Sequence, residues 1–287
     1  MATVETLVRS VLIEEGLENL LAKFAGQPAI FYQEAPIDTA QEWGETQYPR
    51  IVFTADTFAD AERGRRKSLS VDILCAATGP APEEIEPFVR EALAGVFFSP
   101  DDVETFSAKW RETQVFKENI TGREDMLFGM TVNFDIYEYP LLETSDPDPI
   151  MAICRYAQEW DEHLSVIGAS ELPGIYKPTR ENPAVWFSRG NTSMDRQTNT
   201  VVWMNTDLIA HFFAPSLKDR IAWVEQFSQS LALDGRIIML DKSPMFLQRL
   251  IGDAAGDEIS GQLTIGVQFG ILRRPDYAHT MMNAVLK

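Results

Sequence analysis

The chain is poor in the residues from which metal sites and covalent active sites are most often built. It has 2 cysteines and 3 histidines among 287 residues. Cys75 and Cys154 are too few for a disulfide framework and have no metal-binding spacing. His163, His211 and His279 are far apart in the sequence and match no metal-ligand motif. We therefore expect reduced, partly buried thiols, structural histidines and no resident metal or cofactor.

Catalytic motifs are missing too. The sequence has no Gly-x-Ser-x-Gly elbow and no phosphate-binding loop, because residues 252–256 (GDAAG) lack the lysine that such a loop needs. Asp253, Asp257 and Glu258 could in principle bind a cation, but their spacing misses the EF-hand pattern and favours a solvated loop. The acidic pairs at 83–84 and 101–102 stand where helices are expected to begin. The sequence therefore predicts no enzymatic activity.

Long apolar segments are also absent. No run of about 18 apolar residues could span a membrane. The first residues lack the basic stretch and apolar region of a secretory signal. We expect a protein that is made in the cytoplasm and has no membrane partner.

Positive charge is scarce and unevenly distributed. The formal net charge is −18. Residues 1–147 contain 12 basic and 27 acidic side chains, whereas residues 148–287 contain 13 and 16. Tight nucleic-acid binding requires lysine and arginine to neutralise phosphates, so this balance argues against it. An acidic surface along which DNA passes without binding stays possible, because like charges repel.

What the sequence does contain is a long internal repeat. Residues 48–53 (YPRIVF) and 182–187 (NPAVWF) both read as strands introduced by a proline, and the two prolines are 134 residues apart. Residues 134–140 (FDIYEYP) and 269–275 (FGILRRP) start 135 residues apart. A repeat of this length corresponds to a whole domain rather than to a solenoid unit.

Hydrophobic periodicity predicts a similar series of elements in both halves. In the first half we expect helices at 4–25, 82–94 and from 99 toward 110, and strands at 29–32, 51–54, 69–75, 113–117 and 129–139. In the second half we expect helices at 150–163 and 217–234, strands at 184–188, 200–204, 236–240 and 262–272, and a polar loop at 189–199.

These elements predict an α+β protein with two tandem related domains, each a mostly antiparallel sheet packed against helices. The first domain is expected at residues 1–143 and the diverged second copy at 150–287. Residues 144–149 (TSDPDP) are expected to form the linker, because two prolines and two aspartates continue neither helix nor strand.

Two features are candidates for protein–protein contact. Arg63, Arg65, Arg66 and Lys67 form a basic cluster in an otherwise acidic half. Such a cluster is either a solvated loop that offsets nearby acids or an arm that docks onto an acidic neighbour. Trp43 stands in a polar stretch and is the aromatic residue that we most expect to be an exposed contact.

The first half resembles the tail terminator, or tail completion, proteins of long-tailed bacteriophages. The resemblance covers about residues 5–140 and rests on the order and pattern of 28–32 (PAIFY), 48–53, 69–73 (LSVDI), the helix at 84–93 and 134–140. It implies a small α+β domain that forms a ring, usually a hexamer, on the last ring of the tail tube. Such a ring stops tube polymerisation, docks to the head–tail connector and lets DNA pass through its hole.

The resemblance implies a structural virion protein that assembles in the host cytoplasm. Its expected partners are further copies of itself, the tail tube protein, the head–tail connector or neck protein, and the sheath if the tail is contractile. The second half departs from the family, whose common members have one domain. Six chains could form a double-layered or wider ring, or three chains could place six related domains in one ring; the divergence in charge favours six chains. A neck or baseplate adaptor stays open as an alternative, as does a two-domain ligand-binding protein or enzyme with its site between the domains.

Overall fold

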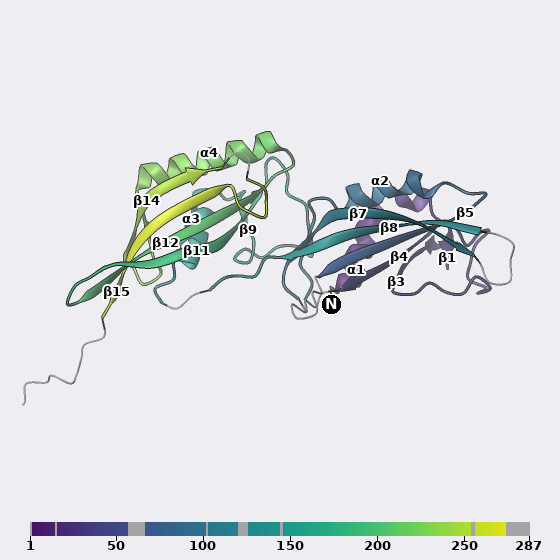
Figure 1. Ribbon diagram of the computed structural model, residues 1–287, viewed down its shortest axis with the longest axis horizontal. Helices are drawn as coiled ribbons and strands as arrows, with labels where there is room; N and C mark the ends of the chain where they lie inside the picture. The colour runs from purple at the N-terminus through teal and green to yellow at the C-terminus, as the bar shows by residue number, and fades with distance from the viewer. Residues whose placement is uncertain are drawn as a thin grey trace, which may run out of the picture. The chain divides into compact units, whose positions relative to one another are not determined.

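The computed structural model of the protein describes residues 2–14, 16–56, 67–101, 103–119, 126–143, 146–253 and 256–273 (Figure 1). The chain divides into two compact units. Unit 1 comprises Met1–Pro140 together with Glu171–Pro178, and unit 2 comprises Leu141–Ser170 together with Thr179–Lys287. The boundaries of the units differ from the expected domain boundaries, because the segment Glu171–Pro178, from the second half of the sequence, belongs to unit 1.

Unit 1 is built on a seven-stranded sheet with the order β10-β6-β7-β8-β5-β4-β3. Only β3 and β4 are parallel, and the other neighbours are antiparallel. Its strands are β3 (Ile30–Tyr32), β4 (Arg50–Asp56), β5 (Ser68–Ala76), β6 (Phe97–Phe98), β7 (Phe106–Asn119), β8 (Met126–Glu138) and β10 (Ile175–Tyr176). A separate two-stranded hairpin consists of β1 (Lys23–Phe24) and β2 (Gln27–Pro28).

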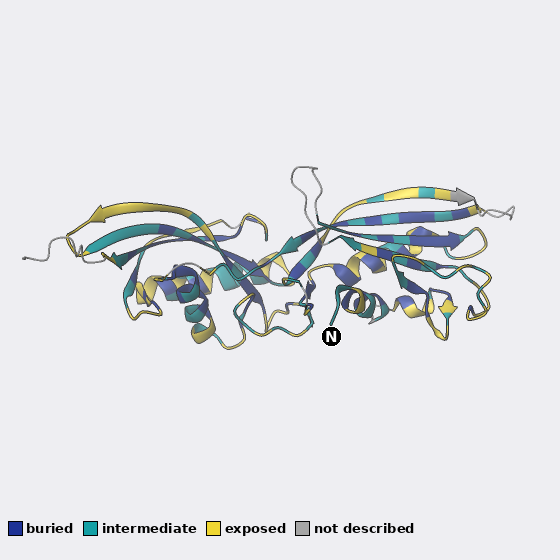
Figure 2. Ribbon diagram, turned by 90° about the horizontal axis from the view of Figure 1, so that it is seen from below, coloured by how far each residue is buried: buried dark blue, intermediate teal, exposed yellow. Residues whose placement is uncertain are grey.

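Two helices cover one face of this sheet, α1 (Val4–Glu14) and α2 (Pro82–Leu93) (Figure 2). The core forms because alternate residues of β5, Leu69, Val71 and Ile73, turn towards them and are completely buried. The helix expected at 4–25 is shorter in the structure. Gly16 adopts a left-handed conformation with φ of 79°, and only a short 3₁₀ turn, Leu17–Asn19, follows it.

Unit 2 is built on a six-stranded sheet with the order β13-β14-β15-β12-β11-β9. Only β9 and β11 are parallel. Its strands are β9 (Ser165–Val166), β11 (Ala184–Gln197), β12 (Val201–Phe213), β13 (Arg236–Ile238), β14 (Pro244–Gly252) and β15 (Leu263–Leu272).

The helices of unit 2, α3 (Pro149–Trp160) and α4 (Leu217–Asp234), also lie on one face of its sheet (Figure 2). Asp148 caps α3 by accepting hydrogen bonds from the backbone N–H groups of Ile150 and Met151. The predicted cap of α4 is confirmed, since the Ser216 hydroxyl accepts the N–H of Asp219 at 3.1 Å. The last turn of α4 ends at Gly235, whose φ of 65° is left-handed.

Apart from the additional edge strand β10 of unit 1, the two sheets have the same strand order and the same strand directions. β3, β4, β5, β8, β7 and β6 correspond in sequence to β9, β11, β12, β15, β14 and β13. In unit 1, Leu69 pairs with Phe134; in unit 2, the residues 135 positions later, Met204 and Phe269, pair with each other. The central strand pairs β5–β8 and β12–β15 therefore share one register, at the spacing seen in the sequence repeat.

The mixed α+β class with helix-covered sheets is confirmed, but two local predictions were wrong and one strand was missed. No helix is found in the described residues 99–101 and 103–110, where one was expected, and residues from Phe106 onward belong to the long strand β7. The polar loop expected at 189–199 is mostly strand β11. The outer half of this strand has exposed side chains that, apart from Met194, are polar, and so lacks the alternating pattern. The strand β14, Pro244–Gly252, was not expected at all.

Candidate functional site

Trp43 is buried, so the prediction that it is an exposed contact was wrong. Its side chain is only 8% exposed and packs edge-on against the rings of Phe24 and Phe31. The indole N–H donates a hydrogen bond to the Ile37 carbonyl at 3.0 Å. Trp43 has polar neighbours along the sequence, but its neighbours in space are apolar side chains from the β1–β2 hairpin and from β3. Trp43 therefore stabilises a small secondary core rather than a partner surface.

The basic cluster falls largely outside the described residues. Arg63, Arg65 and Arg66 lie there, and the structure says nothing of them. Lys67 is described, half-buried, and its ammonium group forms an ion pair with the Glu138 carboxylate of β8. Lys67 is thus bound to its own sheet, and the docking hypothesis rests on the three arginines.

The face of the unit 1 sheet opposite the helices presents a polar network. Cross-strand hydrogen bonds join Ser70 to Asn133 at 2.8 Å and Thr131 to Asp72 at 2.6 Å. This surface comes from the positions of β5 and β8 that alternate with the buried core positions. We call it the open face of unit 1.

The open face of unit 2 is polar in the same way and is hollowed. The residues 135 positions after Asp72, Ser70 and Asn133 are Asp207, Asn205 and Gln268, and all three line a groove of about 380 Å³. Asp207 accepts two hydrogen bonds from the Arg249 guanidinium at 2.8 and 2.9 Å. Gln268 donates to Asn205 at 3.3 Å, at the position equivalent to the Ser70–Asn133 bond. Sequence reasoning missed this surface, although the shared offset of 135 relates Asp72 to Asp207.

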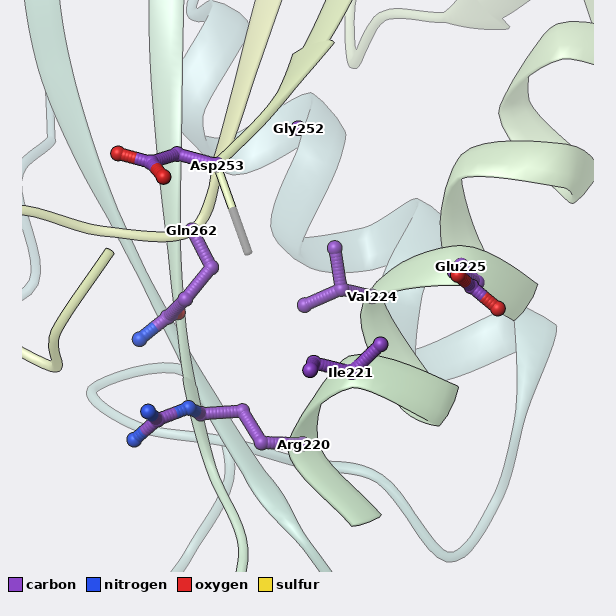
Figure 3. A pocket seen from close by; sticks show the side chains of 7 residues that line it. All are labelled: Arg220, Ile221, Val224, Glu225, Gly252, Asp253 and Gln262. Carbon is purple, nitrogen blue, oxygen red and sulfur yellow. The ribbon is translucent and has the colours of Figure 1, made fainter. Parts of the chain in front are cut away.

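A second cavity lies beside α4. It has a volume of about 180 Å³, and Arg220, Ile221 and Val224 line it from the helix. Gly252, Asp253 and Gln262 line it from the ends of β14 and β15. Figure 3 shows Ile221 and Val224 projecting from α4 into this space, while Glu225 points away. This volume is below the roughly 300–1,000 Å³ that is typical of small-molecule sites.

One serine–histidine pair has the geometry of a nucleophile and its base. The Ser188 hydroxyl lies 2.8 Å from His211 Nε2, and His211 Nδ1 lies 3.0 Å from the Glu258 carbonyl oxygen. Because a carbonyl oxygen only accepts, Nδ1 carries the proton and Nε2 accepts from the serine. Burial lowers the pKa of His211, which keeps the ring neutral.

The surroundings of this pair favour a structural role. The imidazole is 4% exposed, and the Trp186 ring lies against it at 4.9 Å. A Cβ placed on Gly261 would lie 3.4 Å from the imidazole, so the backbone covers the ring closely. Neither Ser188 nor His211 lines the groove or the α4 cavity. The pair therefore stabilises the contact between β11 and β12.

The acidic candidates are used in local structure. The Asp257 carboxylate accepts hydrogen bonds from the N–H groups of Ile259 and Ser260, and Glu258 forms an ion pair with Arg220 at 3.0 Å. Within the described ranges, no group of three or more His, Cys, Asp and Glu side chains could hold a metal ion.

Both cysteines are free and buried. Burial raises the pKa of the Cys75 and Cys154 thiols to about 12, and nearby carboxylates add to the shift. A thiol that stays protonated is a poor nucleophile and a poor metal ligand. The arrangement is that of core residues.

No helix in the described part of the chain is long and apolar enough to cross a membrane. No protein-family model, no curated protein and no solved structure matches the chain.

Proposed function

We propose that the protein is a structural component of a long-tailed bacteriophage virion, a tail terminator that forms a ring on the end of the tail tube. The ring stops tube polymerisation and docks to the head–tail connector, and DNA passes through its hole. The protein acts through surfaces and has no catalytic role.

The observation that carries this proposal is the shared architecture of the two units. The resemblance to tail terminators concerns the first half of the sequence only. Unit 2 has the same strand order, the same directions and the same central register as unit 1. A chain with two such domains can supply equivalent packing surfaces twice, which suits a closed assembly.

The charge distribution supports DNA passage rather than DNA binding. The chain has a net charge of −18, most of it in the first half. A lumen lined by acidic side chains repels phosphates and lets the duplex slide. We therefore expect no stable complex with linear DNA at physiological salt.

The proposed assembly is a homo-oligomeric ring. Six chains are favoured over a trimer of double-domain chains, because the halves differ in charge as surfaces in different environments do. The tail tube protein and the head–tail connector are the proposed neighbours along the tail axis, with the sheath added in a contractile tail.

Negative-stain electron microscopy of the purified full-length chain tests ring formation. We expect closed rings with a central hole as wide as duplex DNA. Their rotational symmetry distinguishes six chains from three. A monomer at every protein concentration would contradict the proposal.

A neck or baseplate adaptor is the second candidate, and its rings would look similar. Antibody labelling of intact virions separates a terminator from a baseplate adaptor. A tail terminator is labelled where the tube meets the head, whereas label at the distal end of the tail would identify a baseplate adaptor. A neck adaptor, which lies at the same end as a terminator, is separated because only a terminator shortens tail tubes.

A further inference from the structure

We infer that copies of this chain join edge to edge, with strand β7 of one copy pairing with strand β11 of the next. The inference rests on the proposed ring and names the surfaces that would build it.

Two of the sheet edges are blocked by arginines. The Arg9 guanidinium donates from α1 to the carbonyl of Ile30 on the edge strand β3, at 3.2 Å. Arg155 donates from α3 to the carbonyls of Ile238 and Met239 at the β13 edge. Such contacts occupy acceptors that another strand would need, and they protect a sheet against unwanted pairing.

Two longer edges have no such protection among the described residues. β6 covers only the beginning of β7, and β9 covers only the beginning of β11. No described strand pairs with the outer side of residues 112–117 in β7 or of residues 187–197 in β11. An open row of backbone donors and acceptors is a template for another strand.

The hydrogen-bond pattern shows which N–H groups point outward. Ile136 of β8 donates to Lys67, so even-numbered residues of β8 face β5 and odd-numbered ones face β7. Val115 is paired with Met130, an even-numbered residue, and its N–H therefore points away from β8. On β12, Ala210 accepts from Gln262 next to β15, so even-numbered residues there face β15. Met194 is paired with Met204, and its N–H also points outward.

Both outward positions have exposed apolar side chains. Val115 is 65% exposed and Met194 is 58% exposed. Each is paired with a residue of the helix-bearing face, because Met130 is buried and Met204 packs against the unit 2 core. Exposed apolar side chains on an edge that no described strand covers are unusual in a monomer, where charged residues or proline normally occupy such positions.

The two sheets are complementary at these edges. In the equivalent strand orders, β7 is fifth and β11 is second, so the open edges lie on opposite sides of equivalent sheets. β4, β5, β8 and β7 alternate in direction, and so do β11, β12, β15 and β14. When the sheets of two copies are set side by side with their helices on the same face, β7 and β11 run antiparallel. Val115 and Met194 then share one face of the joined sheet.

This contact uses two different surfaces of each copy, so it repeats from chain to chain and closes into a ring where the rotation allows. The bulges in β11 between Arg189 and Thr192 and between Met194 and Arg196 interrupt its edge. Bulges restrict pairing to one register, which gives the junction specificity.

Proline substitutions on the full-length chain test the inference. V115P and M194P each remove an outward N–H and leave the inner ladder intact, whereas V115T and M194L keep the N–H and serve as controls. Each proline variant should raise the dissociation constant of assembly roughly tenfold or more, because a hydrogen bond and the strand geometry are both lost. The controls should assemble as the wild type does, and circular dichroism should show that all four variants are folded. If V115P unfolds, V115K, which adds a charge at the junction, is the replacement.

Mixing the two proline variants gives the decisive result. V115P retains the β11 edge and M194P retains the β7 edge, so the mixture should form dimers of one copy of each and grow no further, as measured by sedimentation velocity. Wild-type assembly by V115P, self-association of M194P through β7 alone, or a mixture that stays monomeric would each overturn the inference. If the junction behaves as expected but the wild-type assemblies do not cap tail tubes, the edge pairing stands and the proposed function fails.

Discussion

The helices α2 and α4, which follow the equivalent strands β5 and β12, are anchored differently in the two units. In unit 1, α2 buries five residues along 12, namely Pro82, Ile85, Val89, Ala92 and Leu93. In unit 2, α4 is 18 residues long and buries only Phe227 and Leu231. The sheet of unit 1 therefore holds α2 through buried side chains along the whole helix. The sheet of unit 2 holds α4 mainly through the aromatic ring of Phe227. The two units therefore share a strand order but differ in how the helix packs on the sheet.

The largest expected effect is at Phe227. Its ring is completely buried and contacts the rings of Tyr156, Trp160 and Phe212. F227A should reduce the free energy of unfolding by about 3–5 kcal/mol, because it removes the main anchor of α4. V89A in α2 should cost about 2 kcal/mol.

Urea denaturation of both variants measures this difference. Leu233 in α4 is 88% exposed, so L233A is the matched control and should change stability by less than about 0.5 kcal/mol. A cost for F227A no greater than that for V89A would show that α4 is anchored in some other way.

The equivalent aspartates Asp72 and Asp207 sharpen the comparison between the open faces. Asp72 accepts a hydrogen bond from a neutral threonine, and Asp207 is paired with the Arg249 guanidinium. D72A and D207A should each cost about 1 kcal/mol. Only the D207A cost should shrink at 1 M salt, because an exposed ion pair is screened. Equal salt dependence of the two variants in urea titrations would contradict this account.

The two units should also differ in their response to acid. Burial lowers the pKa of His211 in the folded protein, so the unfolded chain binds a proton first as the pH falls. Stability from this residue is complete above the ordinary histidine pKa of about 6.5 and is lost as the pH falls below it. In H211Q this loss should disappear. Melting temperatures between pH 8 and pH 5 measure the effect; identical profiles for H211Q and the wild type would be evidence against a buried neutral imidazole.

The smallest expected difference is between the two cysteines. Both thiols have a pKa raised to about 12 by burial. Neither should react with a thiol reagent at pH 7.5 within minutes, and both should react after unfolding. Rapid modification of one thiol in the folded chain would show that its unit opens locally.

Much of the fold could be predicted from the sequence where side-chain alternation or a capping motif was strong. Residues 69–75 alternate because one face of β5 is buried, and the Ser216 cap and Gly235 define both ends of α4. The outer half of β11 could not be predicted, because an exposed strand needs no apolar alternation. The assignment of the segment Glu171–Pro178 to unit 1 was not predicted. Its strand β10 has only two residues and pairs with β6, which is far away in the sequence.

The candidate site was harder to predict than the fold. Trp43 was misjudged because polar sequence neighbours do not reveal a pocket made by distant strands. The positions of the open edges depend on the order of the strands in each sheet. The ion pair between Asp207 and Arg249 depends on a bulge in β14. Single-sequence patterns contain little of this long-range information. The repeat spacing of 135 was the one signal that related the two open faces.

The most direct test of the central claim is the length of tail tubes assembled with and without this protein. Purified tube protein that polymerises in the presence of the chain should give short tubes with a ring at one end in electron micrographs. Tubes formed with V115P should be longer and uncapped, because the ring cannot close. Tube lengths that do not change with the wild-type protein would contradict the account.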